Sequence, residues 1–384
     1  MTMTSLLKWA RTAMKRGSSP VLRFPTSGFE IIKQSQILEE ERFEEFKKGH
    51  YYPANIGEVL GSKYQVLGKL GFGTTSTVWL ARDLEGCQYV TLKVYTMDGT
   101  AQREVQIYKA LSQGNTLHPG YSHVRTALDA FTIWHQGNEH HCVVQKPMWG
   151  SFRHFIYRSP GQQLSEDLFK SGLKQIFLAL DYLHSECQLV HTEHPSAGKS
   201  VNNMPVYASR RFELPQDFGR AVLSDFGSAV RGDQKRNHDA QPTIYRSPEV
   251  MLKTEWSYPI DIWNVGTMIW DLFEGKHMFI GLDPDGKGYS TRAHLAELIG
   301  VLGPPPLDLL KRGERSLEFF TKDGHWRRQV DIPWGISLRN SENRLSGRNK
   351  ELFLKFIRGM LQWQPEDRKT AKQLLKDPWL ENRT

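Results

Sequence analysis

The sequence predicts an α+β protein with two lobes: a small antiparallel sheet lobe with one helix, then a larger helical lobe. Short β-branched and aromatic runs, separated by glycine-containing turns, follow residue 64 and are typical of an antiparallel sheet. After residue 150 the strand signals fade and helical patterns dominate. We therefore expect a basic tail and linker over residues 1–50, the sheet lobe over 51–148 and the helical lobe over 149–384.

The individual elements follow from these patterns. The expected strands cover residues 64–70, 77–82, 89–95, 125–134 and 141–145. A helix is expected over 100–112, because Val105, Tyr108 and Leu111 share one face. The expected helices of the second lobe cover residues 164–186, 258–275, 291–302, 349–361 and 371–375. Residues 29–48, rich in Glu and Lys, are expected to form an exposed helix or a linker.

Composition narrows the class of protein. No apolar run approaches the roughly 18 residues that a membrane span needs, so we expect no transmembrane helix and no membrane partner. Three widely spaced cysteines indicate a reducing compartment and argue against a disulfide framework. The net charge of +8 favours acidic partners only weakly. A nucleic-acid partner is not expected, because no recognisable binding module is present.

The first 28 residues are basic and carry no acidic side chain. Two interpretations stay open, a mitochondrial targeting segment and a disordered basic tail. Without targeting, we expect a cytoplasmic or nuclear protein.

A glycine-rich turn lies between the first two expected strands, with Gly71 and Gly73 followed by Ser76 and Val78. Glycines let a backbone approach phosphate oxygens closely, and Val78 can cover an adenine ring. About 20 residues later, strand alternation should place Lys93 on the same face as Val78. The sequence thus predicts a nucleotide-phosphate site at this turn.

Lys93 stands inside an apolar strand, where an ammonium group is costly to bury unless it is paired. Glu104, on the helix that follows, is the expected partner, and the pair would position Lys93 for the α- and β-phosphates. Further along, Asp225 ends an apolar run before Phe226 and Gly227. A carboxylate at such a strand end is a natural magnesium ligand.

Together these motifs resemble the eukaryotic protein kinases and, among them, the SR-protein kinase family of the CMGC group. The resemblance runs from about residue 52 to 380 and rests on Gly71, Gly73, Lys93, Glu104, Asp225-Phe226-Gly227, Ser247-Pro248-Glu249, Asp261-Ile262-Trp263 and Arg368. The narrower family rests on Ser76 in place of a third loop glycine, on Tyr245-Arg246-Ser247 and on the Gly303-Pro304-Pro305-Pro306 insert.

The resemblance implies ATP and Mg²⁺ as cofactors. The ATP-binding residues that it implies are Leu70, Gly71, Gly73, Ser76, Val78, Lys93, Glu104, Lys146 and Met148. The family usually has an acidic residue where Lys146 stands, a change that need not disturb backbone contacts with adenine. Asp225, with Asn202, would hold the metal. Asp261 would anchor the catalytic-loop backbone, His191 would pack beneath Phe226, and Glu249 would form a buried ion pair with Arg368.

The catalytic loop departs from the family pattern His-Thr-Asp-x-Lys-x-x-Asn. Glu193 replaces the catalytic Asp, and in direct alignment Pro195 and Gly198 replace the Lys and the Asn. Alternatively, four inserted residues after Glu193 would restore Lys199 and Asn202 at the right mutual spacing. Thr192 stands where other kinases carry an Arg that binds a phosphorylated activation loop, so an active enzyme should be constitutively active.

The resemblance implies a serine/threonine protein kinase in which Glu193 orients the hydroxyl and Lys199 assists. The alternative is a pseudokinase that keeps the fold, with or without nucleotide binding, and acts as a scaffold or interaction protein. As partner we expect a protein substrate, with an Arg/Ser-rich segment as a candidate, and the chain is expected to be monomeric. Candidates for an acidic docking surface are Asp271, Glu274, Asp283 and Asp285.

Overall fold

The computed structural model describes residues 19–25, 36–97, 101–192, 207, 209, 219–327 and 330–382. These residues form two compact units. The first holds the described residues up to Gln106, then Thr126–Trp149, Tyr207 and Ser209; the second holds Ile107–Arg125 and the other described residues from Gly150 onward. Among the residues described, no helix combines the length and the apolar character that crossing a membrane requires.

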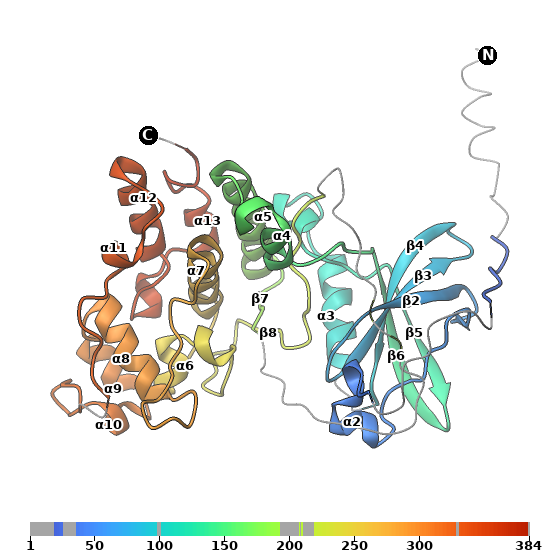
Figure 1. Ribbon diagram of the computed structural model, residues 1–384, viewed down its shortest axis with the longest axis horizontal. Coiled ribbons are helices and arrows are strands. Elements are labelled where there is room, and N and C mark those ends of the chain that lie inside the picture. Colours follow the sequence, from blue (N-terminus) through green and yellow to red (C-terminus); the bar gives the residue numbers. More distant parts are fainter. Residues whose placement is uncertain are drawn as a thin grey trace, which may run out of the picture. The chain divides into compact units, whose positions relative to one another are not determined.

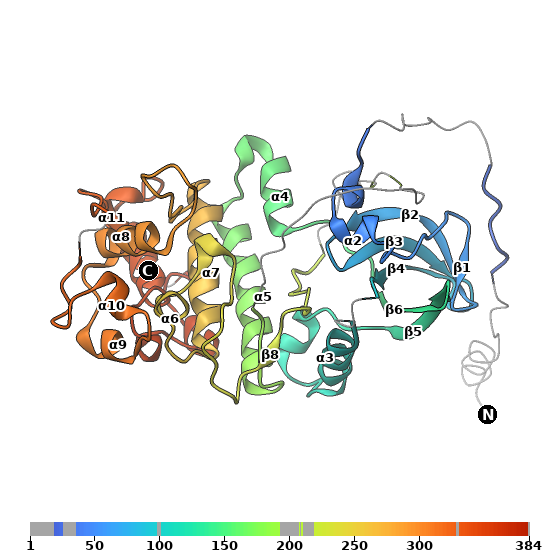
Figure 2. The same cartoon turned by 90° about the horizontal axis from the view of Figure 1, so that it is seen from below.

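The first unit is built on a six-stranded antiparallel sheet in the order β1-β2-β3-β4-β6-β5 (Figure 2). Its strands are β1 (Val59–Leu60), β2 (Tyr64–Phe72), β3 (Ser76–Asp83), β4 (Gln88–Tyr95), β5 (Asp129–His135) and β6 (Asn138–Gln145). Alternating side chains of these strands, among them Val66, Trp79, Ala81 and Leu92, form its apolar core. The sheet lobe expected from the sequence is confirmed.

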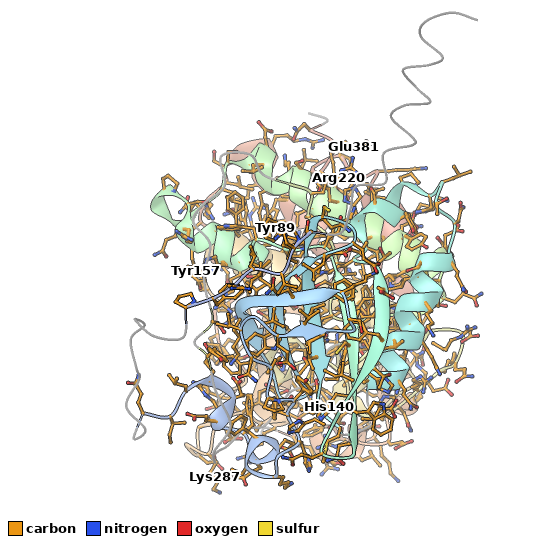
Figure 3. All side chains as sticks on the ribbon, turned by 90° about the vertical axis from the view of Figure 1, so that its right-hand side faces the viewer. Tyr89, His140, Tyr157, Arg220, Lys287 and Glu381 are labelled. Carbon is orange, nitrogen blue, oxygen red and sulfur yellow. The ribbon has the colours of Figure 1, made fainter. Side chains whose placement is uncertain are left out.

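Two strand boundaries differ from the prediction. The strand predicted over residues 125–134 begins only at Asp129, because the Arg125 N–H donates instead to the Leu223 carbonyl, 2.9 Å away. β6 begins earlier than predicted, at Asn138, after a two-residue turn in which Gln136 and Gly137 have φ of 50° and 80°. Two positive φ values match the right-handed twist of a hairpin. His140 of β6 and the exposed Tyr89 of β4 are labelled in Figure 3.

The segment before β1 lies against the sheet of the first unit. Within the range 29–48, the structure describes residues 36–48, which form η1 (Glu39–Glu41) and α2 (Glu44–Lys47). The prediction of an exposed helix or a linker fails at two of the described positions, Glu40 and Phe46, which are buried. Glu40 is buried beside Lys69 of β2, whose ammonium forms ion pairs with both Glu39 and Glu40, and Phe46 packs against Tyr51.

Part of the basic N-terminal stretch also contacts this unit. Leu22 N–H donates to the Gln65 side chain at 2.8 Å, and the Gln65 amide donates back to the Leu22 carbonyl at 2.7 Å. Most of residues 1–28, to which the targeting prediction applies, lie outside the described residues.

The predicted helix over 100–112 is present as α3 (Ala101–Gln113) (Figure 1). Its buried side chains are Ala101, Glu104, Ile107, Tyr108 and Leu111. This spacing of three and four residues places one carboxylate in an otherwise apolar stripe. The boundary between the two units falls inside this helix, after Gln106.

The second unit is mainly helical, as predicted (Figure 1). Its helices are α4 (Phe152–Arg158), α5 (Glu166–Ser185), α6 (Pro248–Leu252), α7 (Pro259–Glu274), α8 (Thr291–Leu302), α9 (Leu307–Arg312), α10 (Ser316–Phe319), α11 (Leu338–Ser341), α12 (Gly347–Arg358) and α13 (Ala371–Leu374). Short 3₁₀ turns are η2 (Pro119–His123), η3 (Pro160–Gln162), η4 (Thr243–Tyr245) and η5 (Pro365–Asp367), and β7 (Leu189–Val190) pairs with β8 (Val230–Arg231).

All five helices predicted for this unit exist within three residues of their expected ends. The prediction missed α4, α6, α9, α10 and α11, which have four to seven residues each. Helices of four to seven residues rarely display a helical period, and α13, equally short, is the exception among those predicted. Aromatic packing joins the long helices, with ring centroids of Phe273 and Phe353 4.7 Å apart and those of Phe353 and Trp379 4.9 Å apart.

Candidate functional site

The glycine-rich turn joins β2 to β3 in the first unit. Gly71 pairs with Val78, and the register shifts between Lys69 and Gly71, so Leu70 is the extra residue of a bulge. The Gly73 N–H donates to the Ser76 carbonyl at 2.8 Å and closes the turn. A Cβ atom built on Gly71 would have no heavy atom within 4 Å. The backbone of this turn therefore borders open space that a ligand could fill.

Lys93 lies opposite Val78 in the β3–β4 ladder, so the two side chains share a face of the sheet, as predicted. Its ammonium is 2.8 Å and 3.0 Å from the two carboxylate oxygens of Glu104 in α3. The exposed fractions of the two side chains are 14% and 4%. The Tyr95 ring lies 4.9 Å from the same ammonium. The predicted ion pair thus exists, with a cation still partly accessible beside the glycine-rich turn.

Lys146 and Met148 follow directly on β6, with Lys146 exposed and Met148 half-buried. Their backbone groups lie just beyond the strand that pairs with the Lys93 strand. Gln145 precedes them at the end of the strand, and the sequence did not predict the surroundings of its side chain. The Gln145 side chain is 1% exposed and pairs across the ladder with Thr91.

Gln145 Nε2 and Thr91 Oγ1 are buried, and neither has a hydrogen-bond partner among the described residues. Residues 91 and 93 alternate along β4, so this polar pair lies on the Lys93 face of the sheet. The sequence signal that could have identified this pair is the presence of two polar residues in two otherwise apolar strands. Buried polar groups without partners are rare in folded proteins, so the effect of replacing Gln145 on stability is informative.

Asp225 lies in the second unit and has a left-handed backbone conformation, with φ of 68°. Its side chain is exposed, whereas Phe226 is fully buried. The Phe226 ring packs against His191 and Tyr108, with centroid distances of 5.3 Å and 5.6 Å. The predicted packing of His191 on Phe226 is confirmed. Burial of this one ring holds the neighbouring carboxylate outward.

Asp261 of α7 accepts hydrogen bonds from the segment that leads into the catalytic loop. His191 N–H lies 2.8 Å and Thr192 N–H 3.3 Å from its carboxylate oxygens, and His184 Nε2 lies 3.0 Å from it. Thr192 Oγ1 donates to the Ser228 carbonyl at 2.5 Å. The predicted anchoring of this backbone by Asp261 is therefore confirmed for its described residues.

The predicted pair of Glu249 and Arg368 is also present. Two guanidinium nitrogens each lie 2.6 Å from a carboxylate oxygen, and both side chains are fully buried. Arg368 also donates to the carbonyls of Pro259 and Gln362, so four of its five guanidinium hydrogens have acceptors. The pair ties α6 to the segment before α13.

Several predicted site residues lie outside the described residues, namely Glu193, Lys199 and Asn202. The two alignments of the catalytic loop therefore stay as predicted alternatives. Within the part of the chain that the structure describes, no group of three or more His, Cys, Asp or Glu side chains is placed to hold a metal ion.

The four candidates for an acidic docking surface are largely engaged within the second unit. Asp271 accepts hydrogen bonds from Tyr245 and from the Met278 N–H, both at 2.8 Å. Asp283 forms a bidentate pair with Arg292, whose hydrogen bond to it holds the pKa of the Asp283 carboxyl well below its usual range. Asp285 lies 3.2 Å from Lys287. Burial raises the pKa of the Glu274 carboxyl.

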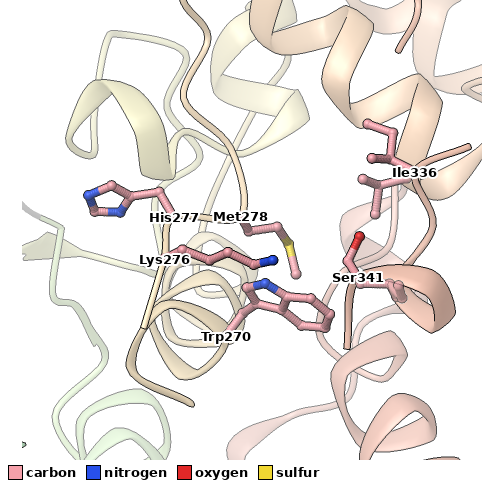
Figure 4. Close-up of a pocket in the computed structure, with 8 residues that line it drawn as sticks. Trp270, Lys276, His277, Met278, Ile336 and Ser341 are labelled. Carbon is pink, nitrogen blue, oxygen red and sulfur yellow. The ribbon is translucent and has the colours of Figure 1, made fainter. Parts of the chain in front are cut away.

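A cavity of about 200 Å³ lies elsewhere in the second unit (Figure 4). Its lining residues are Trp270, Lys276, His277, Met278, Val301, Ile336, Leu338 and Ser341. None of the predicted site residues borders it.

Comparison with known proteins adds a family signal to this geometry. Residues 64–380 match the family model of the protein kinase domain. A serine/threonine protein kinase of Aspergillus fumigatus is 43% identical over 384 aligned residues, which cover 95% of this chain and 96% of the relative.

More distant relatives align over most of the chain as well. The serine/threonine-protein kinase SRPK of Physarum polycephalum is 28% identical and covers 89% of this chain and 91% of its own length. The serine/threonine-protein kinase AFC2 of Arabidopsis thaliana is 26% identical, over 88% of this chain and 82% of its own. The similarity therefore extends through both units.

Proposed function

Since the chain belongs to the protein kinase family, we propose that it transfers the terminal phosphoryl group of ATP to serine or threonine hydroxyls of protein substrates. The observation that carries this proposal is the ion pair of Lys93 and Glu104, which holds a partly accessible ammonium beside an open glycine-rich turn. A structural ion pair alone would require neither the open turn nor the bulge at Leu70.

The residues of the first unit fit a nucleotide. Gly71, Gly73 and Ser76 would present backbone N–H groups to phosphate oxygens, and the missing Cβ of Gly71 leaves room for them. Leu70 and Val78 would cover the base, and backbone groups at Lys146 and Met148 would bind its edge. Lys93, oriented by Glu104, would bind the α- and β-phosphates.

The residues of the second unit fit a hard cation. Asp225 presents a carboxylate, the donor that Mg²⁺ prefers, from a turn held by buried Phe226. Asn202 would be the second ligand in the alignment with an inserted loop segment. When bound, Mg²⁺ would supply positive charge beside the phosphate oxygens.

Glu193 would accept a hydrogen bond from the substrate hydroxyl and orient it for attack, and Lys199 would stabilise the negative charge on the transferred group. Glu is one methylene longer than the Asp of the family pattern, which shifts the carboxylate by roughly an ångström. Misplacement on that scale can cost on the order of a hundredfold in rate. We therefore propose a slow enzyme rather than an inactive one.

The activity should not depend on phosphorylation of the segment after Asp225. Thr192 carries no charge for a phosphate, and Gln241 ties this segment to the Ile260 carbonyl and the Ser247 N–H, both at 2.9 Å. Lys253 and Arg246 form ion pairs with Asp239 of the same segment. These contacts support a segment that is ordered without modification.

As substrate we propose a protein segment rich in Arg and Ser, bound by the chain as a monomer. The support is the resemblance to the SR-protein kinases. Arg292 neutralises Asp283, and hydrogen bonds from Tyr245 and the Met278 N–H occupy Asp271, so the recognition surface for arginine would lie at other residues.

The test is a phosphoryl-transfer assay with purified full-length protein, Mg-ATP and an Arg-Ser repeat peptide, run with Lys93→Met, Glu193→Ala and Asp225→Ala. All three variants should lose at least about a hundredfold in kcat/KM, because each removes a charge next to the transferring group. Lys287→Met is the matched control, since its side chain is 84% exposed and pairs only weakly with Asp285.

Retained activity in Asp225→Ala would contradict the proposed metal ligand, and retained activity in Glu193→Ala would contradict its catalytic role. No transfer by the unaltered protein, with nucleotide still bound, would favour the scaffold alternative instead.

A further inference from the structure

A tyrosine outside the matched kinase domain contacts the glycine-rich turn. Tyr51 precedes the matched range of 64–380. Its hydroxyl oxygen lies 2.8 Å from the Gly73 carbonyl oxygen and 2.9 Å from the Thr74 carbonyl oxygen. Both carbonyls belong to the tip of the turn. A hydroxyl has one hydrogen, so its donation is shared between these two acceptors.

The Tyr51 ring is held firmly in the first unit. Its side chain is 3% exposed, and its ring packs against Phe46 of α2 at a centroid distance of 5.7 Å. α2 follows η1, which is fastened to β2 by the ion pairs of Glu39 and Glu40 with buried Lys69. Hydrogen bonds from Ser209 to the Glu39 carboxylate, at 2.6 Å and 2.8 Å, add a further tie.

Holding these carbonyls also sets the direction of N–H groups. The peptide unit is planar, and none of the described peptide bonds is cis. In a trans peptide the carbonyl of one residue and the N–H of the next point in opposite directions. Donation from Tyr51 to Gly73 and Thr74 therefore turns the N–H groups of Thr74 and Thr75 away from the Tyr51 side of the turn.

The next carbonyl is held from the same unit. The Thr75 carbonyl accepts from the N–H and the hydroxyl of Thr96, at 2.9 Å and 3.2 Å. Three successive carbonyls, of Gly73, Thr74 and Thr75, are thus engaged by protein groups. Among the residues that the structure describes, only Tyr51 acts on two of these carbonyls, and it does so through a single hydroxyl oxygen that a substitution can remove.

We infer that Tyr51 is a positioning residue for phosphate binding, which holds the Thr74 and Thr75 N–H groups toward the phosphates of the nucleotide. This rests on the proposed function, since the turn must bind phosphate. Residues 36–54 then form part of the nucleotide-binding apparatus, although they lie outside the kinase domain match.

The experiment compares Tyr51→Phe with Tyr52→Phe in the full-length protein. Tyr52 is the matched control, because its hydroxyl donates to Glu58 at 2.6 Å and no hydrogen bond joins it to the turn in the described structure. Calorimetric titration of each protein with Mg-ADP, and separately with adenosine, gives two dissociation constants. Adenosine has no phosphates, so it reports on the base site alone.

In Tyr51→Phe the dissociation constant for Mg-ADP should rise about fivefold, the effect of losing one orienting hydrogen bond. The constant for adenosine should stay unchanged, and Tyr52→Phe should match the unaltered protein for both ligands. An equal loss for ADP and adenosine would reveal a general structural role and overturn the inference, as would unchanged ADP binding.

Binding and phosphoryl transfer are measured separately, so failure of either proposal can be told from failure of the other. ADP binding that depends on Tyr51, without transfer by the unaltered protein, would support the positioning role and contradict the kinase activity. Transfer with Tyr51-independent ADP binding would do the reverse. No nucleotide binding by the unaltered protein would overturn both.

Discussion

Asp225 has a backbone conformation that most non-glycine residues avoid, with φ of 68°. Such a conformation costs on the order of 1–2 kcal/mol, although Asp tolerates it better than most residues. It persists because Phe226, next in the chain, is fully buried between aromatic neighbours. Strain of this kind gathers at functional sites, which agrees with the proposed metal-binding role of this carboxylate.

Charged residues of the second unit differ in what they contribute to stability. Arg368→Met should lower the free energy of unfolding by about 3–5 kcal/mol, because it leaves the buried Glu249 carboxylate without its partner. Urea unfolding measures this loss. The control is Arg312→Met, which breaks the more exposed pair with Glu366 and should cost at most about 1 kcal/mol. Equal losses in both variants would contradict the assigned difference.

The amide of Gln145 offers a stabilising substitution in the first unit. Gln145→Leu should raise the free energy of unfolding on the order of 1 kcal/mol, because it removes a buried donor that lacks a partner among the described residues. Gln65→Leu is the contrasting variant, since that equally buried amide is bonded to Leu22 and Gly57, and it should destabilise. Destabilisation by Gln145→Leu as well would contradict an unsatisfied donor at this position.

At the scale of elements, η1 and α2 show how single residues of a charged sequence become buried. Glu39 and Glu40 stand in a run of charged residues, and nothing within that run indicates a partner. Lys69, some thirty residues later, is buried in β2 and forms ion pairs with both. Burial raises the pKa of the Glu40 carboxyl. Against the opposing effect of burial, hydrogen bonds from Lys69 and Ser209 lower the pKa of the Glu39 carboxyl.

Helix α8 should make the stability of the second unit depend on pH through His294. Burial lowers the pKa of this imidazole to about 3 from an ordinary value of 6.5. Tyr289 lies 3.1 Å from its Nδ1, and the nearby Arg246 cation also disfavours protonation. Below pH 6.5 the His294 imidazole is protonated in the unfolded chain, whereas in the folded unit it stays neutral down to about pH 3. The stabilising contribution is thus complete above pH 6.5 and is lost as the pH falls.

The free energy of unfolding should fall by a few kcal/mol, to order of magnitude, between pH 6.5 and 3, and His294→Phe should flatten that dependence. Chemical unfolding at a series of pH values measures both curves. His325→Phe, at an exposed position of the same unit, should leave the slope unchanged. A slope that His294→Phe does not alter would assign the dependence to other groups.

At the scale of the whole molecule, ligand binding and stability are linked by mass action. Mg-ADP at about a hundred times its dissociation constant should stabilise the folded protein by about 2.7 kcal/mol. The rise in Tm should shrink in Lys93→Met at the same nucleotide concentration, because the phosphates lose a cation. Lys287→Met should keep the full rise. A full rise in Lys93→Met would contradict phosphate binding by Lys93.

Much of the architecture could be predicted because the spacing of apolar residues along the chain indicates which segments are strands and which are helices. Alternation in β2 to β4 and the long periods of α5, α7, α8 and α12 each reflect one buried face. The pairs of Lys93 with Glu104 and of Glu249 with Arg368 could be predicted from motif order. Short helices such as α9 and α10 could not, because four to six residues fill less than two turns.

The sequence alone determined the two-lobed fold class, the family and the order of its motifs, since these depend on residue types and on spacing along the chain. Tertiary structure decided which distant groups meet. Tyr51 reaches the carbonyls of Gly73 and Thr74, and Lys69 buries Glu40, across separations of about twenty to thirty residues. Such contacts form because packing of the sheet brings the segments together and burial then demands that each polar group find a partner.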